Sequence, residues 1–193
     1  MDVTTNSFCA SGMHLPNGSY VSFGGNSAVT TGGTQGSQKN ADGSGAWDSL
    51  YQDFDGRKSI RILNPCTISD NLNAGNCAWF DQPDQLSMKK LRWYSTAEPT
   101  GEGQVVIIGG MINGGYINRW LPNVDPTNEA GQAESTYEYF PAENVDPPVV
   151  NFIVRTSGLN VYPLAYLMAS GKILLQANVS TGLFFCPHFR FPV

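Results

Sequence analysis

The chain has 193 residues, of which 41% are hydrophobic and 14% are charged, and its formal net charge is −5 at pH 7. This hydrophobic content is enough for a packed core, so intrinsic disorder is excluded as the main state. The negative net charge gives no attraction to phosphate backbones or anionic lipid. Apolar runs such as Val105–Ile108 are far shorter than the roughly 20 residues that span a bilayer. We therefore expect neither nucleic acid nor a membrane as a partner.

The 21 Gly and 12 Pro residues, without a long helical periodicity, predict an all-β fold of short strands joined by tight turns. Three segments have the pattern of one repeated unit, in which a turn glycine separates two β-rich runs: Phe8–Asn26, Trp93–Gly115 and Val161–Asn178. A strand, a turn and a strand ending in Gly-Gly is typical of the inner hairpin of a kelch-type propeller blade. We expect about three blades of a seven-bladed β-propeller.

The three units align on their turn glycines, Gly18, Gly103 and Gly171. Nine residues before these glycines stand Cys9, Tyr94 and Tyr162. The first strand of every propeller blade lines the central channel, so equivalent positions in successive blades converge on the axis. We therefore expect Cys9 and Tyr94 to be neighbours in space.

The units are further apart than a kelch repeat of about 50 residues, so insertions must separate them. Gly24–Gly45 and Cys66–Cys77 supply the first insertion, and Asn118–Asn151 supplies the second. We expect such insertions to cover one mouth of the propeller or to pack along its side. Acidic residues such as Asp53 and Asp55 are expected to be solvated loop charges.

Cys66 and Cys77 lie in a loop-like segment and could close a small disulfide loop, with two free thiols as the alternative. A zinc site is disfavoured, because no His or second Cys pair lies nearby. Asn17 and Asn178 begin Asn-x-Ser sequons, which are weak signals for glycosylation. The N-terminus shows no basic segment followed by an apolar stretch, so no secretory signal is visible.

Several linked blocks of sequence share a family pattern. They include Ser7–Met13, Leu15–Ser19, Phe23–Asn26, Asp55–Lys58, Arg61–Cys66, Arg92–Thr96, Gly109–Arg119 and Thr136–Pro141. Together they resemble the copper radical oxidases, the group of glyoxal oxidase and galactose oxidase, and above all the N-terminal region of glyoxal oxidase. The resemblance covers roughly residues 2–181, so we expect a partial domain at 1–181 and a tail outside the family at 182–193.

In that family a Cys joined to a Tyr by a thioether forms a one-electron redox cofactor beside a single copper ion. The motif match assigns this pair to Cys9 and Tyr94, with Tyr94 also a copper ligand. A thioether ortho to a phenol lowers its oxidation potential, and the copper-bound phenolate holds the radical where substrate binds. The resemblance implies oxidation of small aldehydes, alcohols or α-hydroxy carbonyls by O₂ to carboxylic acids and H₂O₂. It also implies a secreted protein that is monomeric in full length.

The chain departs from the family in three places. The two His ligands and the axial Tyr of the family copper site have no counterpart here. His14 lies where the family has no ligand, so we expect a surface or turn role. Cys186 and His188 could be a ligand pair, but we expect them to belong to a tail outside the family. Gly109-Gly110 leads into Met111-Ile112-Asn113, whereas galactose oxidase has a stacking Trp shortly after its Gly-Gly, and this difference favours the glyoxal oxidase branch.

Two other functions remain open. One is a plain kelch propeller that binds protein or carbohydrate, which would not need the Cys9 and Tyr94 pair. The other is an inactive fragment of such an oxidase, because Met1–Val3 enters the family pattern in mid-architecture. An open propeller leaves strand edges unpaired, so we expect such a fragment to be poorly stable and prone to aggregate. No phosphate-binding loop, nucleophile elbow or HExxH helix is present in the sequence.

Overall fold

The computed structural model describes residues 3–71, 75–112, 133–156, 161–176 and 182–185. Within these residues, helix is limited to α1 (Asn151–Arg155) and two short 3₁₀ segments, Thr31–Gly33 and Gly75–Cys77. The remaining regular elements are strands in antiparallel sheets, so the predicted all-β class is confirmed. No helix in the described ranges is long and apolar enough to cross a membrane.

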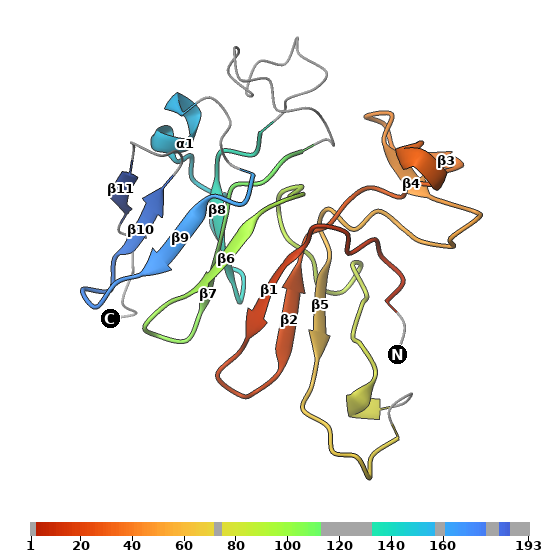
Figure 1. Cartoon of the computed structure of the whole chain (residues 1–193), viewed down its shortest axis with the longest axis horizontal. Coiled ribbons are helices and arrows are strands. Elements are labelled where there is room, and N and C mark those ends of the chain that lie inside the picture. The colour runs from red at the N-terminus through yellow and green to blue at the C-terminus, as the bar shows by residue number, and fades with distance from the viewer. Residues whose placement is uncertain (1–2, 72–74, 113–132, 157–160, 177–181, 186–193) are drawn as a thin grey trace.

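Three three-stranded sheets follow one another along the described chain, each made of a hairpin and one further strand (Figure 1). The first contains β1 (Ser11–His14), β2 (Tyr20–Phe23) and β5 (Ile60–Leu63). The second contains β6 (Thr96–Pro99), β7 (Val105–Ile108) and β8 (Tyr137–Phe140). The third contains β9 (Leu164–Leu167), β10 (Ile173–Gln176) and β11 (Gly182–Phe185). A two-stranded hairpin, β3 (Gln38–Lys39) and β4 (Gly45–Trp47), lies apart from them in an insertion of the first unit.

The same turn joins the first two strands of each sheet. Its glycine has a positive φ of 84°, 85° and 77° at Gly18, Gly103 and Gly171. In each turn the glycine N–H donates to the carbonyl three residues earlier, at 2.9, 3.1 and 2.8 Å. A left-handed glycine at this place closes a three-residue hairpin loop without steric cost. The three hairpins predicted from the turn glycines are therefore present.

Strand β7 lies between two apolar layers, and all four of its side chains are buried. Val105 and Ile107 pack with residues of the first sheet, including Phe23. Val106 and Ile108 pack in the other layer, with buried residues of β8, α1, β9 and β10. Successive side chains of a strand point to opposite faces, so a continuous apolar run fits a strand that is covered on both sides. The second sheet is thus packed between the first and the third.

The first strands of the sheets approach one another, with β1 beside β6 and β6 beside β9. Glycine makes this approach possible: a Cβ on Gly24 would lie 2.0 Å from the Arg92 carbonyl oxygen. Within the second sheet, a Cβ on Gly110 would lie 2.9 Å from the carbonyl oxygen of Trp93. The Gly-Gly pairs of the sequence therefore serve a close contact between neighbouring backbones as well as a turn.

Two further sequence expectations fall on described residues. Cys66 and Cys77 form a disulfide with a Cα–Cα distance of 5.6 Å, in the loop that follows β5. Gly182–Phe185, which the sequence assigns to a tail, forms β11 and pairs with β10 in antiparallel register. This strand is the third of its sheet, as β5 and β8 are in theirs.

The packing of β7 predicts a large cost for shortening a side chain that faces the second apolar layer. Ile108→Ala is expected to lower the free energy of unfolding by about 3 kcal/mol, because it leaves a cavity in a closely packed layer. Leu164→Ala is the control, since Leu164 is 51% exposed on β9 and its truncation is expected to cost under about 1 kcal/mol. Urea unfolding of both variants measures the difference. Equal midpoints would contradict the central position of β7.

Candidate functional site

Cys9, Tyr94 and Tyr162 share an uncommon backbone conformation. Their φ angles are 59°, 60° and 46°, and each residue stands two positions before the first strand of its sheet. Gln52 is the only other non-glycine residue with positive φ in the described ranges. This region costs an L-residue on the order of 1 kcal/mol or more and is enriched at functional sites. The three sheets therefore repeat a strained residue at one structural position.

Backbone hydrogen bonds join the three strained residues. The N–H of Tyr94 donates to the Cys9 carbonyl at 3.2 Å, and the N–H of Tyr162 donates to the Tyr94 carbonyl at 2.7 Å. The rings of Tyr94 and Tyr162 meet edge to face, with centroids 5.2 Å apart and planes at 84°. The structure thus brings Cys9 beside Tyr94, as the repeat offset predicted, and adds Tyr162 to the same cluster.

The titration of both phenols reflects their contact with the cysteine. The pKa of Tyr94 is raised to about 12, first by burial and then by a side-chain hydrogen bond to Cys9 and the charge of Cys9. Burial also raises the pKa of Tyr162, followed by the charge of Cys9 and a hydrogen bond to its side chain. Both phenols are therefore protonated near neutral pH, and both hydroxyls can donate to the Cys9 sulfur. Cys9 itself is partly exposed and forms no disulfide.

Trp93 supplies an aromatic neighbour that the sequence analysis missed. Its ring centroid lies 4.3 Å from that of Tyr94, and its indole N–H donates to the Phe8 carbonyl at 3.1 Å. Met111, at the position where the sequence predicted no stacking ring, is buried and pairs with the Trp93 backbone. The aromatic contact with Tyr94 therefore comes from the adjacent residue in the chain, with the two ring planes tilted by 42°. The Gly-Gly pattern of the sequence gave no sign of this contact.

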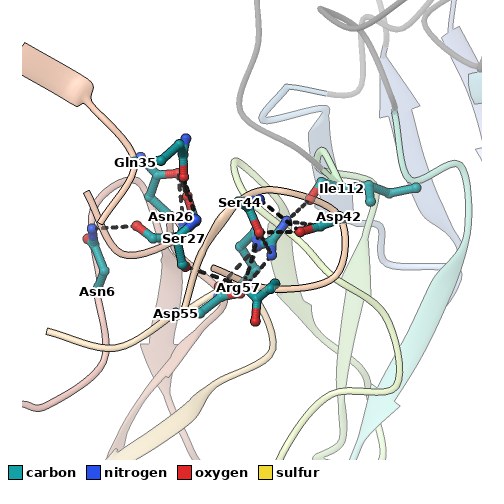
Figure 2. A network of polar contacts seen from close by, with 11 residues as sticks. Asn6, Asn26, Ser27, Gln35, Asp42, Ser44, Asp55, Arg57 and Ile112 are labelled. Carbon is teal, nitrogen blue, oxygen red and sulfur yellow. Dashed lines mark hydrogen bonds and ion pairs between the residues drawn. The ribbon is translucent and has the colours of Figure 1, made fainter. Parts of the chain in front are cut away.

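Arg57 connects the insertion hairpin to the first two sheets. Figure 2 shows its guanidinium at the centre of a network of polar contacts. Its Nε donates to Asp55 at 3.0 Å, and its Nη1 donates to Asp42 at 3.0 Å and to the Ile112 carbonyl at 2.7 Å. Ser44, near the start of β4, accepts from Nη2. One buried side chain thus links the β3–β4 turn with the segment that follows Gly109-Gly110.

Charge pairing explains how the Arg57 side chain is buried. Burial disfavours its charge, but hydrogen bonds and charges of Asp55 and Asp42 outweigh this and raise the pKa of Arg57. Burial likewise opposes ionisation of Asp42, yet bonds from Ser44 and Arg57 hold its pKa below 3.8. Asp55 is therefore an ion-pair partner, and its expected role as a solvated loop charge is wrong. A sequence with Asp and Arg two positions apart gives no sign of this burial.

The remaining sequence candidates lie away from the cluster or outside the described residues. His14 is exposed on β1 and meets Tyr20 edge to face at 5.3 Å, as expected for a surface residue. Asn17 is exposed in the β1–β2 turn, where its side chain accepts from the Ser19 N–H at 3.0 Å. Asn178, Cys186 and His188 lie outside the described residues.

A cavity of about 450 Å³ lies along β8 and the following loop. Its lining includes Lys89, Tyr139 and Val145, and none of its lining residues is Cys9, Tyr94 or Tyr162. The Lys89 ammonium donates to the carbonyls of Glu143 and Val145, which holds this loop against the sheet. The cavity is therefore separate from the cysteine–tyrosine cluster.

The fold and the cluster define an all-β protein of repeated antiparallel sheets, with a cysteine beside two tyrosines where the sheets meet. Comparison with known proteins shows which proteins of this class the chain is similar to. Aldehyde oxidase GLOX from Vitis pseudoreticulata is 24% identical over 181 residues, which are 92% of this chain and 24% of that protein. Aldehyde oxidase GLOX1 from Arabidopsis thaliana is 27% identical over 178 residues, or 91% of this chain and 20% of that protein.

A WSC domain-containing protein from Arthroderma benhamiae is 26% identical over 177 residues, or 90% of this chain and 14% of that protein. No protein-family model matches the chain. The two relatives named aldehyde oxidase GLOX and GLOX1 support the family resemblance found in the sequence. The chain spans about a quarter or less of the length of these relatives.

The Arg57 network predicts that the insertion hairpin opens when the guanidinium is lost. Arg57→Gln is expected to raise the rate of trypsin cleavage after Lys39, on β3, by about fivefold or more, because local opening governs cleavage of a folded chain. Cleavage after Lys172, in the β9–β10 turn, serves as the internal control and is expected to be unchanged. Peptide mass mapping over time measures both rates. A uniform increase at both sites would instead indicate global destabilisation.

The lowered pKa of Asp42 predicts an acid-dependent contribution to stability. The folded pKa lies below the unfolded value of about 3.9, so this contribution is complete above that pH and is lost as pH falls through the folded pKa. The Ser44 amide donates to Asp42 Oδ1 at 3.0 Å, so its NMR chemical shift reports the titration. We expect a midpoint below the ordinary value of an aspartate and no such transition in Asp42→Asn. A midpoint above that ordinary value in the folded chain would contradict the network.

Proposed function

We propose that this chain contributes the Cys9–Tyr94 redox pair of a glyoxal oxidase-type copper radical oxidase. In this proposal the three sheets are blades of a kelch-type propeller, and Cys9 and Tyr94 stand at its axis. The observation that carries it is the hydrogen-bonded contact of Cys9 and Tyr94 at equivalent strained positions of neighbouring sheets. The aldehyde oxidase names of two relatives lend support from an independent source.

The chemistry of the pair is the formation of a thioether. The Cys9 sulfur bonds to the Tyr94 ring carbon ortho to the hydroxyl, and the S–H and ring C–H hydrogens leave as two protons and two electrons. Dioxygen accepts the electrons and becomes hydrogen peroxide, so the atoms and charges balance. A phenol substituted in this way is easier to oxidise by one electron, as a radical cofactor requires. The Trp93 ring lies against the Tyr94 ring, with centroids 4.3 Å apart.

Copper belongs to the proposed enzyme, but the described residues do not fit a complete copper site. They contain no group of three or more His, Cys, Asp or Glu side chains that could hold a metal ion. Tyr94 offers one phenolate oxygen, whereas copper in such oxidases also needs nitrogen ligands. We therefore derive no step through copper and assign to this chain only the thiol and phenol chemistry.

The substrates proposed for the whole enzyme are small aldehydes or α-hydroxy carbonyl compounds together with O₂, with carboxylic acids and H₂O₂ as products. A secreted, monomeric enzyme is part of the same proposal. The Cys66–Cys77 disulfide supports secretion, since disulfides form and persist mainly in oxidising compartments.

Intact mass and peptide mapping test the proposed pair. After treatment of the purified chain with Cu(II) and O₂, we expect a loss of two hydrogens and a reductant-resistant link between the peptides that carry Cys9 and Tyr94. Cys9→Ser and Tyr94→Phe should each abolish the link, the first by removing the sulfur and the second by removing the phenol that directs oxidation to its ortho carbon. Tyr166→Phe, an exposed position on β9, is the matched control and should link normally.

Two unlinked peptides in the parent chain would count against the proposal. That result would favour one of the other two functions, a binding propeller or an inactive piece of an oxidase. Amperometric detection of peroxide during the treatment gives a second readout. One equivalent of H₂O₂ per link is expected from the electron balance.

A further inference from the structure

Tyr162 occupies, in the third sheet, the position that Cys9 and Tyr94 occupy in the first two. Its φ of 46° lies in the same left-handed region, and it stands two residues before β9 as Tyr94 stands two residues before β6. Its backbone N–H donates to the Tyr94 carbonyl at 2.7 Å. The backbone of Tyr162 is thus fixed directly to the residue whose phenol the proposed function uses.

Packing does not explain this conformation of Tyr162. The residue is 40% exposed, so its ring contributes little to the apolar layers, which contain Ala165, Ile173 and Leu175 of the same sheet. A bulky residue with positive φ carries a conformational cost that a surface tyrosine could avoid. A strained, half-exposed tyrosine is expected where the surrounding structure fixes the residue for a purpose other than core formation.

The side chain of Tyr162 reaches both members of the pair. Its ring lies edge to face against the Tyr94 ring, at 5.2 Å and 84°. The raised pKa of its phenol, caused first by burial and then by the charge and hydrogen bond of Cys9, agrees with a hydroxyl that donates to the sulfur. Tyr94 and Tyr162, which come from two different sheets, thus share the Cys9 side chain as a hydrogen-bond partner.

We propose that Tyr162 is a positioning residue of the Cys9–Tyr94 pair: its ring orients the Tyr94 ring, and its hydroxyl holds the Cys9 sulfur beside that ring. A thioether forms only where sulfur and the ortho carbon are held in contact, and orientation of this kind can contribute several powers of ten to a rate. The inference rests on the proposed function for the thioether itself. The placement of the sulfur by Tyr162 can be tested without copper.

The first experiment measures alkylation of Cys9 by iodoacetamide in the metal-free chain, with the Cys66–Cys77 disulfide intact and the Cys9 peptide identified by mass. The limiting rate is the plateau that the alkylation rate reaches as pH rises, where thiols react as thiolates. Tyr162→Phe keeps the ring and removes the donor, so the thiolate loses a hydrogen bond and the limiting rate is expected to rise about threefold or more. Tyr166→Phe, 51% exposed on the same sheet, is the matched control with an unchanged rate.

The second experiment measures the rate at which the Cys9–Tyr94 link forms with Cu(II) and O₂. We expect Tyr162→Phe to slow the link about fivefold and Tyr162→Ala to slow it further, with Tyr166→Phe at the parent rate. Far-UV circular dichroism and the urea midpoint verify that the variants fold like the parent. Tyr162→Phe is the informative variant, because its ring is retained.

The outcomes separate the inference from the proposed function. An unchanged alkylation rate in Tyr162→Phe overturns the inference whatever happens to the link. A raised alkylation rate with a link that forms at the parent rate overturns the positioning role. A raised alkylation rate in a chain that forms no link in any variant supports the placement of the sulfur by Tyr162 and overturns the oxidase chemistry.

Discussion

The arrangement of the three sheets depends on two backbone hydrogen bonds at their common end. The Tyr94 N–H donates to the Cys9 carbonyl and the Tyr162 N–H donates to the Tyr94 carbonyl, so each sheet is fixed to the one before it, two residues ahead of its first strand. All three residues are in the left-handed region, which turns the chain sharply into each strand. The same geometry that joins the sheets brings a thiol and two phenols together, so the candidate site is a direct product of the repeat.

Buried arginines fix the segments around this common end. Arg92 donates to Glu138 at 2.8 Å and to the Gly109 carbonyl at 2.7 Å, which ties β8 to the Gly-Gly turn of the same sheet. Arg61 makes the corresponding bond to the Gly24 carbonyl at 2.7 Å in the first sheet. Its nearest carboxylate, Asp81, is 3.8 Å away, and burial lowers the pKa of Arg61 to about 10. A planar guanidinium satisfies several carbonyls at once, which suits it to this role.

The fold and the candidate pair were predictable from the sequence to different extents. The turn glycines Gly18, Gly103 and Gly171 located the three hairpins correctly, because a left-handed turn leaves a mark in residue type. The equal spacing of Cys9 and Tyr94 from their turn glycines predicted that the two residues are neighbours in space. The role of Asp55 could not be predicted, since its partner Arg57 is buried by the β3–β4 hairpin and by Ile112, which lie far from each other in the chain. The aromatic contact of Trp93 with Tyr94 depends on ring orientation, which no spacing encodes.

By itself the sequence determined the all-β class, the repeated hairpins and the family resemblance that its relatives support, and it left Cys66 and Cys77 as either a disulfide or two free thiols. These features follow from local rules: turn residues, strand periodicity and short spacing. Only the tertiary structure decided which face of β7 meets which layer, that Arg57 is buried, and that Tyr162 joins the Cys9–Tyr94 pair. These features arise where segments distant in sequence pack together, and packing depends on the shape and orientation of all partners at once.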